Sequence, residues 1–207
     1  MSENSRRGKR RERKPTDKKR GEIMNNNIRK FGTLMLHGMP MPKPEKPFYK
    51  GDVIGYNGTD FEISDTVEGK ELTWLKVGDL WVCDRNILMG VSWDTLNGKG
   101  YVFGKEITID GHRFKVRCLT GSDGSEDSYG AGCDNEWDKF MDEYNEDNDL
   151  THYEDMYTIC QETDCDYSGC RSVRGYRSAR YYDYFSATYA CTGIAFRPAL
   201  EELNPAG

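Results

Sequence analysis

Three cysteines spaced by five residues, with a histidine nearby, are the first candidates for chemistry in this chain. Cys160, Cys165 and Cys170 follow His152, and such a group could supply a nucleophilic thiol and its base. The spacing differs from the paired C-x-x-C arrangement of structural zinc sites, so a metal centre is not predicted. The chain has seven cysteines, and an odd number does not imply a complete disulfide framework. Without a Ser/His/Asp arrangement or a phosphate-binding glycine loop, no catalytic residue is predicted, and a thiol-dependent enzyme stays an alternative.

Carboxylates are the second group that could do chemistry, and they crowd the stretch between Asp123 and Asp166. Calcium prefers such oxygen ligands, and Asp147, Asn148 and Asp149 are the candidate residues. The spacing of an EF-hand loop is absent, and a solvated acidic face accounts for the same residues. The sequence therefore predicts no cofactor and leaves calcium open.

Residues 163–192 have the most unusual composition. Six tyrosines and four arginines stand among Ser, Asp, Gly and Ala. Antibody paratopes use the same mixture, because Tyr gives a large amphipathic contact at low entropic cost and Arg adds planar hydrogen bonding and stacking. The alternative is an irregular loop whose tyrosines pack onto the domain. Displayed to solvent, the segment would bind a protein or a glycan, and the candidate contact residues are Tyr176, Arg177, Ser178, Arg180, Tyr181, Tyr182, Asp183, Tyr184, Ser186 and Tyr189.

Charge divides the chain into two unlike parts. Residues 1–20 contain ten basic and three acidic side chains, a net charge of +7, whereas the whole chain carries −6 and the remainder therefore −13. We expect residues 1–22 to form a basic disordered tail that contacts nucleic acid or an acidic protein surface. No signal peptide or membrane-spanning stretch is visible, which predicts a cytoplasmic or virion-associated protein with no membrane partner.

The Pro-rich run GMPMPKPEKP predicts a linker over residues 23–47, followed by one domain over residues 48–207. Its N-terminal part, 48–100, reads as β-rich, with short apolar runs between Gly, Asn and Asp turns. The clearest local pattern is ITIDGHRFKVRCL, in which apolar residues alternate on either side of Asp110-Gly111, a favoured two-residue hairpin turn.

Two helices are predicted after this hairpin. Trp137, Phe140, Met141 and Tyr144 fall on one helical face, which we expect to be buried against the sheet that includes Ile107, Ile109, Phe114 and Val116. The segment THYEDMYTIC, residues 151–160, has capping-box spacing and a second apolar stripe. After a long segment of little periodicity, GIAFRPAL predicts a closing strand.

Four of these segments resemble one known family. RCLTG (117–121), NEWDKF (135–140), VRGYRSAR (173–180) and GIAFRPAL (193–200) resemble, in order, the motifs of the formylglycine-generating-enzyme branch of the C-type lectin-like fold. The resemblance covers about residues 100–203. It implies an α+β class: a C-type lectin-like domain with short helices around small antiparallel sheets and much irregular loop. Since the enzyme's catalytic cysteines are missing after VRGYRSAR, the resemblance implies the fold and not the activity.

The same fold branch includes the variable proteins of diversity-generating retroelements of phages and bacteria. In that family, adenine-directed mutagenesis changes surface positions near the C-terminus, and a mutagenised AAC codon cannot yield Trp, Met, Lys, Gln or Glu. Residues 163–192 contain none of these five types. The sequence thus predicts a non-enzymatic recognition protein of variable-protein type. A structural virion or scaffold protein held by its basic arm is the other alternative.

Overall fold

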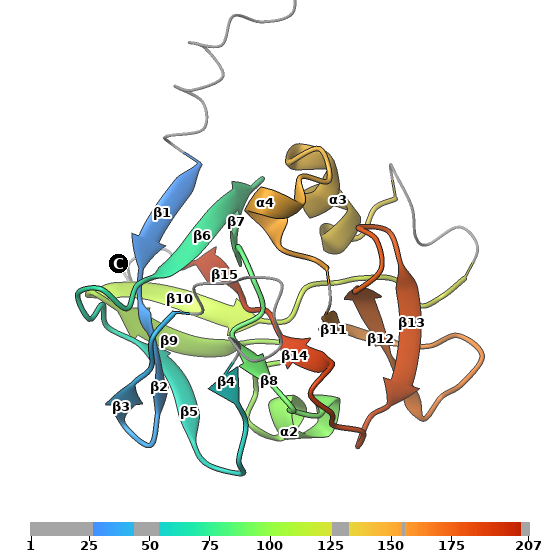
Figure 1. Ribbon diagram of the computed structural model, residues 1–207, viewed down its shortest axis with the longest axis horizontal. Coiled ribbons are helices and arrows are strands. Elements are labelled where there is room, and N and C mark those ends of the chain that lie inside the picture. Colours follow the sequence, from blue (N-terminus) through green and yellow to red (C-terminus); the bar gives the residue numbers. More distant parts are fainter. Residues whose placement is uncertain (1–26, 44–53, 126–132, 155, 204–207) are drawn as a thin grey trace, which may run out of the picture.

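The structure is a computed structural model that describes residues 27–43, 54–125, 133–154 and 156–203. Of the described residues, 42% lie in strands and 11% in helices. The strands form two six-stranded sheets and one three-stranded sheet (Figure 1). The predicted α+β class is therefore wrong, because the fold is mostly β and includes an antiparallel half-barrel. No helix in the described part of the chain has the length and apolar character needed to cross a membrane.

The first sheet is the half-barrel. Its strands, in spatial order, are β1 (Ile28–Phe31), β6 (Leu72–Val77), β7 (Leu80–Cys83), β15 (Ala199–Glu202), β10 (His112–Arg117) and β9 (Lys105–Ile109). The sheet curls strongly, so that Phe31 from one edge stacks on Phe114 near the other with 5.5 Å between ring centroids. Packing of these rings across the curled sheet places much of the hydrophobic core inside the half-barrel.

The predicted hairpin around Asp110-Gly111 is confirmed. β9 and β10 pair antiparallel, with Ile109 opposite His112. Asp110 and Gly111 have φ angles of 52° and 79°, which a two-residue hairpin turn of this type requires at both positions.

The second sheet has the order β13 (Tyr182–Ser186), β12 (Cys170–Gly175), β11 (Tyr157–Thr163), β14 (Ile194–Phe196), β8 (Leu88–Met89) and β4 (Ile54–Gly55). A smaller sheet joins β3 (Met39–Pro40), β2 (Thr33–Leu36) and β5 (Phe61–Ser64). β1, β2 and β3 lie within residues 23–47, where a linker was predicted. Burial explains the difference, because Leu34 and Leu36 are core residues and prolines are confined to the end of this stretch.

The helices are α2 (Trp93–Gly98), α3 (Glu136–Glu143) and α4 (Asn148–Thr151). The predicted apolar face of α3 is confirmed, since Trp137, Phe140 and Met141 are fully buried. Its expected partner sheet is also confirmed, because α3 packs on Leu75 and Val82, which belong to the sheet that contains β9 and β10. Phe114 belongs to the core cluster on the opposite face of that sheet.

The helix predicted over residues 151–160 is wrong. α4 ends at Thr151, His152 adopts a left-handed conformation with φ 43°, and β11 begins at Tyr157. β11 is central in its sheet, pairing with β12 on one side and β14 on the other. These two sets of backbone hydrogen bonds stabilise a strand more than the local apolar pattern stabilises a helix. The β-branched Thr158 and Ile159 also favour the strand.

Candidate ligand-recognition surface

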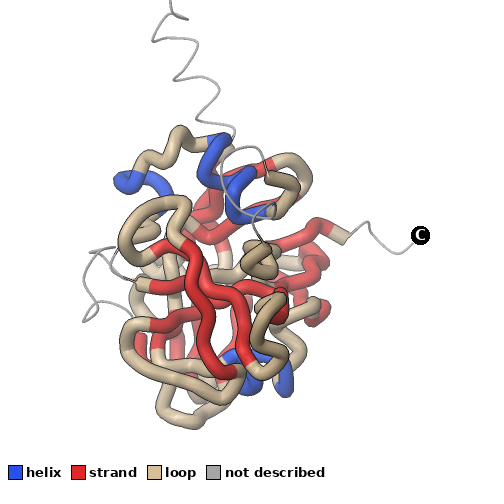
Figure 2. Tube along the Cα trace, turned by 90° about the vertical axis from the view of Figure 1, so that its right-hand side faces the viewer, coloured by secondary structure: helices blue, strands red, loops and turns tan. Residues whose placement is uncertain are grey.

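The tyrosine-rich segment folds into an antiparallel hairpin at one end of the molecule. β12 and β13 pair with Ser172 opposite Tyr184, and β13 is the edge strand of its sheet. The hairpin lies at the right of Figure 1 and faces the viewer in Figure 2. Residues 163–192 show little periodicity in the sequence, yet cross-strand pairing fixes which of their side chains share a face.

One face of the hairpin bears a group of packed aromatic rings, here called the aromatic strip: Tyr157, Tyr176, Tyr181, Phe185 and Tyr189. Tyr157 is central, stacking on Tyr176 at 4.6 Å and meeting Phe185 edge-on at 5.2 Å between ring centroids. Phe185 in turn stacks on Tyr189, which is 48% exposed. Contacts of this geometry add about 0.5–1.5 kcal/mol each beyond the area they bury.

Polar groups border the aromatic strip. The guanidinium of Arg177 lies 5.2 Å from the ring centroid of Tyr181 and 5.8 Å from that of Tyr176. The Tyr157 hydroxyl donates to the Asp183 carboxylate at 2.8 Å, and burial with this hydrogen bond raises the pKa of Tyr157 above its usual range. The strip therefore combines flat apolar surface with a cation and a carboxylate at fixed positions.

The aromatic surface continues beyond the segment that composition singled out. Arg171, opposite Phe185 on β12, places its guanidinium 4.4 Å from the ring centroid of Trp93. Trp93 meets Phe103 edge-on at 5.9 Å, and Phe103 is 57% exposed. Phe103 thus extends the surface toward α2, and the buried Trp93 supports it from beneath.

Alternation along β13 sends a second set of tyrosines to the other side of the strand. Tyr184 stacks on Tyr167 with 5.0 Å between ring centroids, and both are exposed. Tyr182 is half-buried, and its hydroxyl donates to Asp164 at 2.6 Å. Tyr182 therefore anchors the loop that precedes β12, whereas Tyr184 is available for contact.

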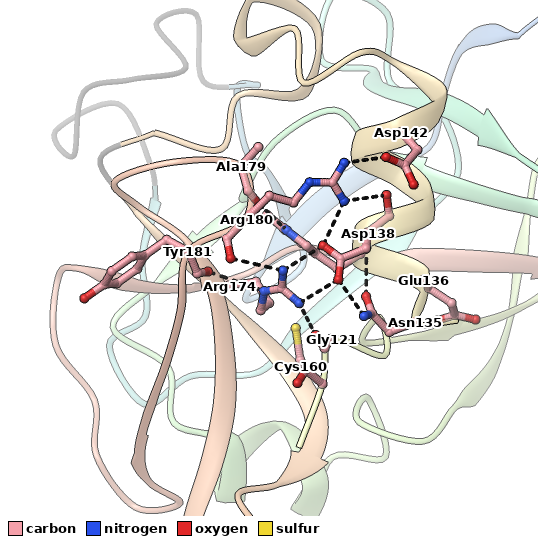
Figure 3. Close-up of polar contacts among 12 residues, drawn as sticks. Gly121, Asn135, Glu136, Asp138, Asp142, Cys160, Arg174, Ala179, Arg180 and Tyr181 are labelled. Atoms are coloured by element: carbon pink, nitrogen blue, oxygen red, sulfur yellow. Dashed lines mark hydrogen bonds and ion pairs between the residues drawn. The ribbon is translucent and has the colours of Figure 1, made fainter. Parts of the chain in front are cut away.

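A fully buried ion pair clamps this hairpin to α3. Arg174 on β12 donates to Asp138 on α3 at 2.7 and 3.2 Å, and neither side chain is exposed. Arg180 donates to the same carboxylate at 3.0 Å, and Asn135 does so at 2.6 Å. Figure 3 shows these donors converging on Asp138, while the ring of Tyr181 points away from the cluster. The clamp thus fixes the backbone beneath the displayed rings.

The turn that follows β12 demands a glycine. Gly175 has φ 86°, and a Cβ there would lie 2.9 Å from the Tyr153 carbonyl oxygen and 3.3 Å from the Trp137 ring. Tyr176 also has a positive φ, 81°, and its backbone N–H donates to the same Tyr153 carbonyl at 2.8 Å. A strained non-glycine residue next to a display surface is a feature typical of functional sites.

The four segments that resemble motifs of the formylglycine-generating-enzyme branch meet at α3. Arg117 donates to Glu136 at 2.6 Å, and the indole of Trp137 donates to the Ala179 carbonyl at 2.7 Å. Arg197 places its guanidinium 5.3 Å from the Trp137 ring centroid. These positions therefore build one buried polar and aromatic cluster beneath the hairpin.

Searches against family models, curated proteins and solved structures found no match to this chain. The family resemblance stays a prediction.

The structure separates the ten predicted contact residues into three groups. Arg177, Ser178, Tyr184, Ser186 and Tyr189 are exposed; Tyr176, Tyr181, Tyr182 and Asp183 are half-buried at the surface of the hairpin. Arg180 instead pairs with Asp138, Asp142 and Glu146, which makes it part of the support. The prediction missed the exposed Phe103 and the buried Tyr157 and Trp93 that support the surface, because they lie outside the segment and only tertiary packing brings them to it.

Two of the three thiols, together with His152, lie in environments that disfavour nucleophilic chemistry. Burial raises the pKa of Cys160 well above its usual value, and desolvation, followed by the neighbouring aspartates, raises the pKa of Cys165. His152 contacts the Arg85 guanidinium at 3.0 Å, and burial lowers its pKa to about 4. A catalytic thiol needs a lowered pKa, so these environments give no support to the thiol-enzyme alternative.

The candidate calcium residues use their oxygens to cap α4. Asp147 accepts from the backbone N–H of Asp149, and the Asn148 side chain accepts from that of Tyr153. Within the described ranges, no cluster of three or more His, Cys, Asp and Glu residues is arranged to hold a metal ion.

Proposed function

We propose that this protein is a ligand-recognition module that binds a protein or a glycan through the aromatic strip and the adjoining side chains of the β12–β13 hairpin. The observation that carries the proposal is the pairing of exposed aromatic side chains with a backbone clamped by a fully buried ion pair. Rigid aromatic anchors bind at low entropic cost, and a fixed backbone reduces the cost further.

The net charge of the domain favours a protein or glycan ligand over nucleic acid. The chain beyond residue 20 carries a net charge of −13, which repels a polyanion from the domain. Flat tyrosine faces with hydroxyl, guanidinium and carboxylate groups suit protein side chains and sugar rings alike. A composition accessible to mutagenised AAC codons supports the further proposal that the surface is diversified, as in retroelement variable proteins.

The binding test compares two exposed tyrosines with one anchored tyrosine. Tyr184→Ala and Tyr189→Ala should keep the free energy of unfolding within about 0.5 kcal/mol, as surface substitutions do. Each should weaken binding by about 2 kcal/mol or more if it contacts the ligand centrally. Tyr182→Ala serves as the matched comparison, because loss of its hydrogen bond to Asp164 should lower stability first.

Ligands would be found by probing a glycan array and a panel of phage and bacterial surface proteins with the wild-type chain. If binding by Tyr184→Ala and Tyr189→Ala falls only in proportion to the folded fraction, the surface is structural and the proposal fails. Diversification has its own test in the neighbouring DNA. A reverse-transcriptase gene and a near-identical template repeat of the 3′ coding region are the expected findings.

A further inference from the structure

A groove of about 770 Å³ opens at the far end of the molecule from the recognition surface, at the mouth of the half-barrel. It lies between β1 and the β9–β10 turn, and Glu202 and Leu203 complete its wall. Phe31 and Phe114 stack beneath it, and Ile109, 1% exposed, adds to this apolar floor. Open ends of β-barrels are common places for small-molecule sites, because the side chains there leave an apolar cavity with a polar rim.

The ionisable groups of the groove favour an anion. Three cationic side chains line it, Arg29, Lys30 and Arg113, against the acids Asp110 and Glu202, and Arg113 pairs with Glu106 at 2.7 Å. Both acids already accept short hydrogen bonds: Asp110 from the Thr66 backbone N–H at 2.8 Å, and Glu202 from the Trp81 indole at 2.7 Å. The charge of the two acids is thus directed partly to protein donors, which leaves Arg29 and Lys30 as the cations of the lining that can pair with a ligand.

Arg29 is the residue best placed to hold an acidic group. Its guanidinium lies 4.6 Å from the Trp81 ring centroid, which orients the planar group. Its ion pair with Glu202 spans 3.7 Å, longer than a hydrogen bond, and both side chains are more than half exposed. An oriented guanidinium beside an apolar floor suits a carboxylate or sulfonate attached to an aromatic or aliphatic body.

From this geometry we infer a second binding site, specific for small amphipathic anions, at the mouth of the half-barrel. The ligand's apolar body would rest on Phe31 and Phe114 while its acidic group pairs with Arg29 and Lys30. The basic segment at the start of the chain does not fit this groove, because its net charge of +7 repeats the sign of the lining.

The test uses two fluorescent probes with a similar aromatic body: anilinonaphthalene sulfonate, an anion, and N-phenyl-1-naphthylamine, which is neutral. The wild-type chain should bind one sulfonate probe saturably. Arg29→Glu and Lys30→Glu should each weaken that binding about tenfold or more, yet change binding of the neutral probe by less than about twofold. Lys139→Glu, at an exposed position of α3 outside both surfaces, is the matched control and should change neither. Far-ultraviolet circular dichroism verifies that each variant is folded, and Lys30, being exposed, provides the variant that least disturbs packing.

Several results would overturn the inference. One is the absence of saturable binding, and another is equal sulfonate affinity in Arg29→Glu and Lys139→Glu. Stronger dye binding on dilution would show that a second copy of the chain occupies the groove. Stronger dye binding after removal of residues 1–22 would show that the chain's own N-terminus occupies it. Because the recognition surface lies elsewhere, a negative result for the groove does not contradict the proposed function, which is tested separately with the Tyr184→Ala and Tyr189→Ala variants.

Discussion

Asp138 accepts hydrogen bonds from Arg174, Arg180 and Asn135 while its side chain is fully buried. Removing one partner of such a pair leaves an uncompensated charge in a low-dielectric interior. Asp138→Asn should therefore cost about 3–5 kcal/mol of unfolding free energy, measured by urea denaturation at pH 7. Asp142→Asn is the matched control, since Asp142 binds Arg180 at a site 44% exposed and should cost less than about 1 kcal/mol. Equal losses would show that the clamp does not contribute as its geometry implies.

His152 gives the fold a predictable dependence on pH. Its Nε2 lies 3.0 Å from the Arg85 guanidinium and Nδ1 lies 2.8 Å from the Asn148 carbonyl oxygen, a setting that suits the neutral ring with the proton on Nδ1. Burial, aided by Arg85, lowers the pKa from 6.5 to about 4. The unfolded chain therefore binds this proton first, so stability is full above pH 6.5 and falls as pH drops toward 4.

We expect His152→Asn to remove this loss, because asparagine tolerates the left-handed backbone and does not titrate. The measurement is the urea midpoint of each protein at pH 7 and pH 4.5. The ratio of the two midpoints should be closer to one in the variant. A wild-type midpoint that does not change between these pH values would contradict the assignment. Asp84, whose pKa is lowered, contributes its own dependence only below its usual pKa of 3.8.

At the scale of elements, the β9–β10 hairpin depends on its two-residue turn. Gly111→Ala places a Cβ at φ 79°, where L-residues are strained, and should cost about 1–2 kcal/mol. Gly98 at the end of α2 is the control, because its Cβ would meet open space and its φ is not in the strained region. Gly98→Ala should be neutral or slightly stabilising. The measurement is the melting temperature of each variant, and we expect that of Gly111→Ala to be the lower. Equal melting temperatures would mean that the turn accommodates the Cβ without strain.

The whole molecule is electrically divided, with a basic N-terminal segment and an acidic remainder. Residues 1–22 lie outside the described residues, so their partner stays a prediction. We expect the full chain to bind duplex DNA weakly, with an affinity that falls steeply between about 50 and 200 mM salt. Deleting residues 1–22 should abolish that binding and leave the melting temperature nearly unchanged. A clear drop in melting temperature would show instead that the segment docks on the acidic domain.

Local patterns in the sequence determined the features that depend on neighbouring residues. The Asp110-Gly111 hairpin follows from the backbone conformations that these two residues tolerate, and the buried stripe of α3 follows from helical spacing. The tyrosine-rich composition likewise marked a segment of which several residues are exposed, including Tyr184 and Tyr189. Each of these predictions needed only short-range periodicity or turn chemistry.

Tertiary structure alone decided the rest. Residues 157–160 form a strand and not a helix, because β12 and β14 supply backbone partners from far along the chain. Tertiary packing likewise adds Phe103 to the recognition surface and places the buried Tyr157 and Trp93 beneath it, and the composition of residues 163–192 does not indicate any of the three. Asp138 looked like one residue on the polar side of a helix, and only the approach of Arg174 made it the buried centre of the clamp. Long-range pairing and burial depend on contacts between distant residues, which no local pattern encodes.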